Sequence, residues 1–137
     1  MAVDYDFDGR VVLVTGAAGA LGSAIAEAFD AAGATVCAAD IVEEGSDDVS
    51  VDRSRVHYYQ GDFTDEAVVE ETVGAVVEDH GRLDALCNIA GTWRGGTPID
   101  ETDADTFDFL FDLNLKTMFL ASKHAIPHLR ETGGAIV

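Results

Sequence analysis

Lysine is nearly absent from this chain, and basic side chains of any kind are few. The 137 residues include 8 Lys and Arg against 26 Asp and Glu, which gives a formal net charge of −18. A chain that binds nucleic acid needs cations to neutralise phosphates, so this composition excludes a nucleic-acid partner. The same charge disfavours an anionic membrane surface.

The acidic residues are spread from Asp4 to Glu131 and do not form a tail. One explanation is an ordinary acidic protein with a solvated face. The other, which we favour, is a halophilic protein, because molar salt shortens the screening length to about 3 Å and removes the self-repulsion of such a surface. We therefore expect multi-molar salt to stabilise the isolated chain.

Long apolar runs are missing as well. No stretch approaches the roughly 18 apolar residues of a membrane-spanning helix, and residues 1–6 are acidic where a secretory leader would be basic. We therefore expect no membrane-spanning helix and no secretory leader, and we expect a cytoplasmic location. Cysteine is scarce too: Cys37 and Cys87 lie in segments that we predict as buried strands, so both should be reduced core residues.

A glycine-rich segment, TGAAGALG at residues 15–22, follows the continuous apolar run 10–14. Such a run is typical of a strand buried on both faces of a parallel sheet. A helix should follow and stop at Gly33, with a buried face made of Leu21, Ile25, Ala28, Phe29 and Ala32. Glycines let backbone approach a pyrophosphate, and the helix N-terminus offers free N–H groups to it. Because a strand precedes this segment and a helix follows it, we predict that it binds a dinucleotide and is more than a tight turn without a ligand.

A carboxylate, Asp40, ends the next predicted strand, residues 35–39. Its distance from the glycine turn is close to the spacing of about 20 residues at which an acid binds ribose hydroxyls. A carboxylate there also repels the extra phosphate of NADP, and neither Arg nor Lys follows directly. We therefore predict NAD in preference to NADP, with a solvated loop acid as the alternative interpretation.

The rest of the chain continues the alternation of strands and helices. Further strands are predicted at residues 56–60, 83–87 and 134–137. One intervening helix should have Thr64 as its N-cap and end at Gly81, and a longer helical stretch should run from about Thr102 to Arg130, bent or ended by Pro127. The pattern predicts an α/β fold: a Rossmann-type doubly wound parallel sheet, incomplete at its C-terminal edge, that makes residues 1–137 a single partial dinucleotide-binding domain.

Two smaller features leave alternatives. His124 and His128 lie one helical turn apart, which could suit a metal, but no third ligand accompanies them and we expect no metal site. Trp93 and Arg94 follow the fourth predicted strand. Ligands bind outside the carboxyl ends of strands in such sheets, so these residues either line a substrate pocket or Trp93 caps apolar surface.

Taken together, these motifs resemble the N-terminal part of the short-chain dehydrogenase/reductase family over essentially the whole chain. Segment 15–22 resembles the family's cofactor turn, with Ala20 where glycine is frequent, and NIAG at 88–91 resembles its Asn-Asn-Ala-Gly segment. The resemblance places Asp62 at the adenine ring and gives Asn114 the family's catalytic asparagine position, which helps to hold a proton relay. The cofactor-binding residues that we expect are Thr15, Gly16, Ala20, Leu21, Gly22, Asp40, Asp62, Phe63, Asn88, Ala90 and Gly91.

The resemblance also calls for a catalytic Ser after strand 134–137 and a later Tyr-x-x-x-Lys. None of the three tyrosines has a lysine at that spacing, and Lys116 and Lys123 both lie in the helical stretch of Asn114. Of the family's catalytic positions only Asn114 is present. We therefore expect this chain to be truncated, inactive alone and prone to association at its open sheet edge.

By resemblance, the function is that of an NAD(P)-dependent oxidoreductase that transfers hydride between nicotinamide and a small-molecule alcohol or ketone, with this chain supplying the cofactor-binding half. The complete protein should be a homodimer or homotetramer. A non-catalytic nucleotide-binding module or pseudoenzyme stays open, as does a sugar-nucleotide epimerase or dehydratase, whose glycine pattern segment 15–22 also fits. Residues 88–91 together with Asn114 favour the alcohol-type branch.

Overall fold

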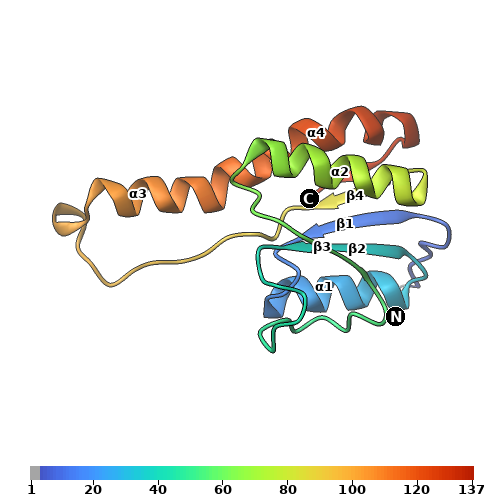
Figure 1. Cartoon of the computed structure of the whole chain (residues 1–137), viewed down its shortest axis with the longest axis horizontal. Coiled ribbons are helices and arrows are strands. Elements are labelled where there is room, and N and C mark those ends of the chain that lie inside the picture. Colours follow the sequence, from blue (N-terminus) through green and yellow to red (C-terminus); the bar gives the residue numbers. More distant parts are fainter. Residues whose placement is uncertain (1–3) are drawn as a thin grey trace.

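The computed structural model describes residues 4–137 and contains a five-stranded parallel sheet with helices on both faces (Figure 1). The spatial order is β3-β2-β1-β4-β5. The predicted α/β class is thereby confirmed, while the first three residues of the acidic N-terminal stretch lie outside the described part. The strands are β1 Val11–Thr15, β2 Thr35–Asp40, β3 His57–Gln60, β4 Ala85–Cys87 and β5 Ala135–Ile136.

Helices cover both faces of the sheet, with α1 below it and α2 and α4 above it in Figure 1, while α3 extends beyond the sheet. They are α1 Ala20–Ala31, α2 Glu66–His80, α3 Ala104–Phe111 and α4 Thr117–Thr132, with a 3-10 turn, η1, at Ile99–Glu101 and a π turn, η2, at Asp112–Lys116. Within residues 4–137, none of the helices has both the length and the apolar character that crossing a membrane requires.

The central strand β1 is apolar at successive positions because each of its faces meets a helix layer. Val12 and Val14 belong to the core on the α1 side, whereas Leu13 packs with Val73 of α2 and Leu120 of α4. All five of its residues are buried. Strand order reverses between β1 and β4, and the carboxyl ends of strands at such a point form the usual ligand crevice of doubly wound sheets.

The buried face of α1 differs from the predicted one. Leu21 is 66% exposed and Ala28 is exposed, whereas Gly22, Ser23 and Ala26 are buried. Small residues face the sheet here because the helix packs closely on the strand that precedes it. Ile25 and Phe29 of the predicted face are partly buried and pack against the core, whereas Leu21 is exposed where it lines the cavity at the end of the strands.

The start of α2 is also one residue later than predicted. Asp65, not Thr64, is the N-cap, and its side chain accepts a hydrogen bond from the Ala67 N–H at 2.9 Å. Thr64 is instead engaged by Asp62, whose Oδ1 accepts from both the backbone N–H and the hydroxyl of Thr64. This Asx turn uses up the hydroxyl that the sequence offered as a cap.

The long helical stretch is three elements rather than one. It starts after Asp103, the N-cap of α3, and passes through η2 before α4 continues to Thr132. Pro127 lies inside α4 and does not end it. The residue is exposed, so water can replace the hydrogen bond that proline cannot donate. Gly133, in a left-handed conformation, is the actual stop.

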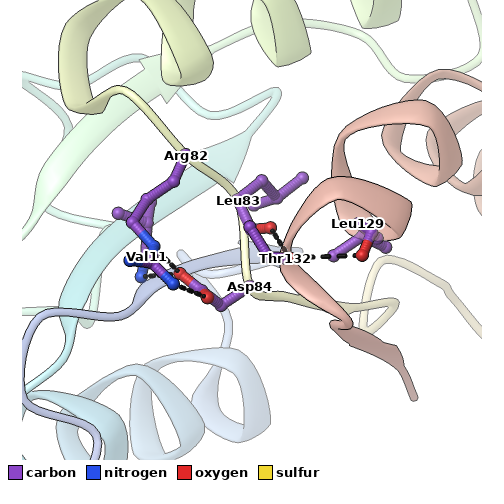
Figure 2. Close-up of polar contacts among 6 residues, drawn as sticks. All are labelled: Val11, Arg82, Leu83, Asp84, Leu129 and Thr132. Atoms are coloured by element: carbon purple, nitrogen blue, oxygen red, sulfur yellow. Dashed lines mark hydrogen bonds and ion pairs between the residues drawn. The ribbon is translucent and has the colours of Figure 1, made fainter.

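An ion pair between Arg82 and the buried Asp84 lies just before β4, and Asp84 also binds the start of β1 (Figure 2). Asp84 accepts hydrogen bonds from Arg82 Nε at 2.7 Å, Arg82 Nη2 at 2.6 Å and the Val11 N–H at 2.9 Å. Burial alone would raise the pKa of Asp84, but these hydrogen bonds and the Arg82 charge outweigh it and lower the pKa. Thr132 at the end of α4 donates to the Leu83 carbonyl at 2.7 Å, so the same loop also anchors α4.

Cys37 and Cys87 are both buried and free, as predicted. They lie in β2 and β4, on opposite sides of β1. Burial raises the pKa of Cys37 to about 12, so this thiol stays protonated and behaves as a small apolar core residue.

Candidate nucleotide-binding site

A cavity of about 560 Å³ lies at the carboxyl ends of β1, β2 and β4, where the strand order reverses. This volume is within the range of ordinary small-molecule sites. Ten of the eleven predicted cofactor residues line it: Thr15, Gly16, Ala20, Leu21, Gly22, Asp40, Asp62, Phe63, Ala90 and Gly91. The exception among the eleven is Asn88.

Two glycines of the turn between β1 and α1 are required by close backbone approaches. Gly16 has φ +65°, and a Cβ at this position would lie 2.7 Å from Ala90. A Cβ on Gly22 would lie 2.2 Å from the Gly16 carbonyl oxygen. The turn is therefore packed against itself and against the segment after β4, which leaves a backbone-lined cradle facing the cavity.

The N-terminus of α1 is left open by the protein. Its N-cap is Gly19, which has no side chain to accept a hydrogen bond, and the first turn contains no acid. Helices α2 and α3 differ, because each begins at an aspartate N-cap and has an acid in its first turn, while α4 continues directly from η2. In a chain with 26 acids, the start of α1 keeps its N–H groups and partial positive charge for an external anion.

Asp40 ends β2 with its carboxylate fixed by two backbone donors. Oδ2 accepts from the Ala18 N–H at 2.9 Å, and Oδ1 accepts from the Val42 N–H at 3.1 Å. A carboxylate has about four acceptor positions, so each oxygen keeps one lone pair for a ligand. A pair of vicinal hydroxyls, such as those of a ribose, fits this remaining capacity.

Thr15 connects the two strands that flank the reversal point. Its hydroxyl oxygen accepts from the backbone N–H groups of Ile89 and Ala90, both at 3.0 Å, and donates toward the Cys87 carbonyl at 3.4 Å. These contacts hold segment 89–91 beside the glycine turn. On the other side of the cavity, Asp62 and the buried Phe63 follow β3, and the Gly61 N–H donates to the Asp40 carbonyl at 2.8 Å.

Asn114 and Asn88 do not line the cavity but stand behind its wall. Asn114 lies in the π turn η2, and its Oδ1 accepts from the Thr92 N–H at 2.9 Å. A Cβ on Gly91 would lie 2.7 Å from this oxygen, so glycine is needed there. Asn88 donates toward Ser122 Oγ at 3.4 Å, and its buried Oδ1 has no hydrogen-bond partner within residues 4–137.

Some cavity residues carried no recognisable signal in the sequence. Ala18 contributes only its N–H, Val42 comes from the loop after β2, and Leu113 and Thr117 come from η2 and α4. Each depends on how a loop or turn folds back over the sheet. The only indication in the sequence is that residue 18 is small, which allows its backbone to approach Asp40 of β2 closely.

The two weaker candidate features lie elsewhere. The Arg94 guanidinium stacks over Phe109 of α3, 3.7 Å from the ring centroid, and Trp93 is 82% exposed. Neither residue lines the cavity, and the exposure of Trp93 shows that it does not cap apolar surface. His124 Nε2 lies 3.1 Å from Glu66 Oε1, which also accepts from Lys123. Across residues 4–137, no three His, Cys, Asp or Glu side chains are grouped so as to hold a metal ion.

The parallel sheet, its order and the crevice at the reversal point define a protein with a Rossmann fold. The family follows from comparison with known proteins. A family model described as short chain dehydrogenase matches residues 10–137, and the chain belongs to that family.

Curated relatives are similar over the whole chain. The D-threitol dehydrogenase of Mycolicibacterium smegmatis is 35% identical over 100% of this chain and 55% of its own length. The meso-2,3-butanediol dehydrogenase of Serratia marcescens is 37% identical over 96% of this chain and 53% of its own. Among solved structures, a glucose/ribitol dehydrogenase from Brucella melitensis has a TM-score of 0.83 and 30% identity, over 93% of this chain and 53% of that one. The chain thus spans about half the length of the relatives it matches.

Proposed function

We propose that this protein is an NAD-dependent oxidoreductase in which residues 1–137 bind the cofactor. The observation that carries the proposal is the pairing of Asp40 with the open N-terminus of α1 across one cavity. A positive helix end suits a pyrophosphate, and a fixed carboxylate with free lone pairs suits the ribose hydroxyls. A dinucleotide contains both a pyrophosphate and ribose hydroxyls.

We assign the following roles to the predicted residues around the cavity. Gly16 and Gly22 shape the cradle for the pyrophosphate, Asp62 and Phe63 flank the adenine, and Ala90 with Gly91 borders the nicotinamide half. Asn114 holds the segment after β4 through the Thr92 N–H and supports a proton relay. When bound, the nicotinamide supplies or accepts a hydride. The residues described here bind the cofactor and orient it.

The substrate that we propose is a small-molecule alcohol or its ketone, with hydride moving to or from the carbinol carbon. The support is the short chain dehydrogenase family match and the names of the relatives, which act on threitol and butanediol. The same match favours a dehydrogenase over a sugar-nucleotide epimerase. We place the protein in the cytoplasm.

We also propose that the protein assembles as a homodimer or homotetramer. The support within this chain is a set of exposed apolar side chains along α3, η2 and α4. They are Phe107, Phe111, Leu115, Met118 and Phe119, each between 40% and 61% exposed. An apolar surface of this extent on a protein is usually covered by a partner.

Replacing Asp40 with Asn tests the cofactor assignment. Wild type should bind NAD⁺ at least about 10-fold more tightly than NADP⁺ at low salt, because the carboxylate repels the 2′-phosphate at short range. Asp40→Asn removes that repulsion and weakens acceptance from the ribose, so we expect the preference to shrink by about 10-fold. Isothermal titration calorimetry with both nucleotides measures the ratio.

The matched control is Asp48→Asn, which removes one negative charge from an exposed position on the same cavity wall. Solvent screens that charge, so the NAD⁺/NADP⁺ ratio should stay within about two-fold of wild type. Equal binding of the two nucleotides by wild type would refute the NAD assignment. A chain that bound neither nucleotide would refute the cofactor-binding function itself.

We further propose that the acidic surface is an adaptation to molar salt. With a net charge of −18 on residues that are mostly exposed, self-repulsion opposes the compact state at low ionic strength. Raising KCl from 0.1 M to 3 M should therefore increase the melting temperature of the chain by roughly 10 °C or more. Thermal melts followed by circular dichroism give the answer, and a melting temperature independent of salt would exclude this explanation.

A further inference from the structure

Val42 connects Asp40 to Tyr58, a residue that does not line the cavity. The backbone N–H of Val42 donates to Asp40 Oδ1 at 3.1 Å, and the Val42 carbonyl accepts from the Tyr58 hydroxyl at 2.8 Å. Val42 itself lines the cavity. One peptide segment is thus held on one side by the carboxylate and on the other side by a phenol from the neighbouring strand.

Tyr58 is well placed to hold this segment rigidly. It lies in β3 opposite Ala38 of β2, and its ring packs against the core on the α1 side of the sheet. Only the hydroxyl reaches beyond the strand, toward the loop that follows β2. Burial, followed by the negative charge of Asp40, raises the pKa of Tyr58 to about 12. The phenol therefore stays protonated at neutral pH and remains a hydrogen-bond donor.

The loop after β2 has few other attachments near its start. Residues 41–56 contain no helix or strand, and Ile41 is 61% exposed. The Ser50 N–H donates to the Ala18 carbonyl at 3.0 Å, but this contact lies further along the loop. Without the Tyr58 hydroxyl, the Val42 carbonyl loses its hydrogen bond, and the backbone of Val42 is then freer to move its N–H away from Asp40.

We propose that Tyr58 is a positioning residue for the ribose site, acting through Val42 to fix the Asp40 carboxylate in the orientation that accepts the ribose hydroxyls. This inference rests on the proposed NAD-binding function and extends it to a residue outside the cavity wall. A carboxylate that must be ordered when the ligand binds costs affinity, whereas one already fixed does not. Tyr58 therefore contributes to NAD affinity without contacting NAD.

The test is a double-mutant cycle between Tyr58→Phe and Asp40→Ala, read out as the dissociation constant of NAD⁺ by calorimetry. Phe keeps the ring and removes one hydroxyl, and Ala removes the side-chain acceptor of the Val42 N–H. In the wild-type background we expect Tyr58→Phe to weaken NAD⁺ binding about five-fold, the usual effect of one hydrogen bond. In the Asp40→Ala background the same change should alter binding by less than about two-fold, because the group through which it acts has been removed.

Tyr59→Phe is the matched control from the same strand. Its hydroxyl donates to Asp79 at 2.7 Å, and its ring packs against the opposite face of the sheet, so it loses a hydrogen bond of similar kind without touching Val42. It should leave the NAD⁺ dissociation constant within about two-fold of wild type. Thermal melts of all variants verify that each one folds.

Three results would overturn the inference. Unchanged NAD⁺ binding by Tyr58→Phe would show that the hydroxyl has no effect on the site. An equal five-fold loss in both backgrounds would show that Tyr58 acts independently of Asp40. Failure of wild type to bind NAD⁺ at all would remove the proposed function, and this inference with it, before any variant is compared.

Discussion

Gly22→Ala will reduce NAD⁺ affinity by roughly 100-fold and destabilise the chain by about 1–3 kcal/mol. A Cβ at this position would lie 2.2 Å from the Gly16 carbonyl oxygen, 2.7 Å from the Gly16 carbonyl carbon and 2.8 Å from Ala17 Cα. All three are backbone atoms, so no side chain can move aside. The turn itself must open, and the N–H groups at the start of α1 then lose their common focus.

The affinity estimate follows from the number of hydrogen bonds at risk. If the opened turn loses two or three phosphate contacts, each with a net value of about 1 kcal/mol, the dissociation constant rises by about two orders of magnitude. Calorimetry with NAD⁺ and urea denaturation of the free chain measure the two effects separately. Binding by Gly22→Ala within about three-fold of wild type would contradict the steric account of the cradle.

Two alanine substitutions serve as controls for the added methyl group. Gly19→Ala lies in the same segment, but its Cβ would meet the Gly16 carbonyl oxygen only at 3.6 Å, an ordinary contact. It should reduce stability by no more than about 1 kcal/mol, the usual cost of alanine at an N-cap. Gly74→Ala, in the middle of α2 with open space around it, should stabilise the chain by up to about 1 kcal/mol and leave NAD⁺ binding unchanged.

The sheet and its ligand edge were predictable because strands leave simple marks in the sequence. The continuous apolar runs at β1 and β2 indicated burial on both faces, and Asp40 and the glycine-rich segment follow those runs directly. In a parallel sheet, residues that follow strands lie at one edge. Ten of the eleven predicted cofactor residues lie in one cavity for this reason.

Details that depend on tertiary contacts were not predictable in this way. The Asx turn of Asp62 displaced the start of α2, and α1 packs on the sheet through Gly22, Ser23 and Ala26, which leaves Leu21 and Ala28 exposed. The π turn at Asp112–Lys116 interrupts a segment whose apolar pattern suggests one continuous helix. The helical or apolar pattern favours each predicted choice, and a specific hydrogen bond, close packing or change of helix type in the folded chain replaces it.

The position of Asn88 shows the same limit within the site. Its neighbours Ala90 and Gly91 line the cavity, yet Asn88 lies behind them with Ser122 of α4. The chain leaves β4 at Cys87, and Ile89, Ala90 and Gly91 all line the cavity, whereas Asn88, directly after the strand, does not. The motif identifies the segment, but the folded structure decides which of its residues line the cavity.

Asp84→Asn will destabilise the chain by about 2–3 kcal/mol, the largest effect that we expect from a change outside the cavity. The Asp84 side chain is only 3% exposed and accepts three hydrogen bonds, two from Arg82 and one from the Val11 N–H. The amide of Asn has a donor where the carboxylate has an acceptor, so at least one of these donors loses its partner. The Arg82 side chain is 46% exposed and can turn to water, which keeps the cost below that of a fully buried broken pair.

Urea denaturation at pH 7 measures this loss, and Asp108→Asn, the same change at an exposed residue of α3, should stay within about 0.5 kcal/mol of wild type.

The pH dependence of stability gives a second readout. Because the folded-state pKa of Asp84 is lowered, its contribution is complete above the unfolded value of about 3.9 and is lost as pH falls through the folded value. The stability difference between wild type and Asp84→Asn should therefore be constant from pH 5 to 7 and narrow below pH 4. A difference that persisted undiminished at pH 2 would mean that the pair stabilises the fold by shape and packing and that the charge of Asp84 is not required.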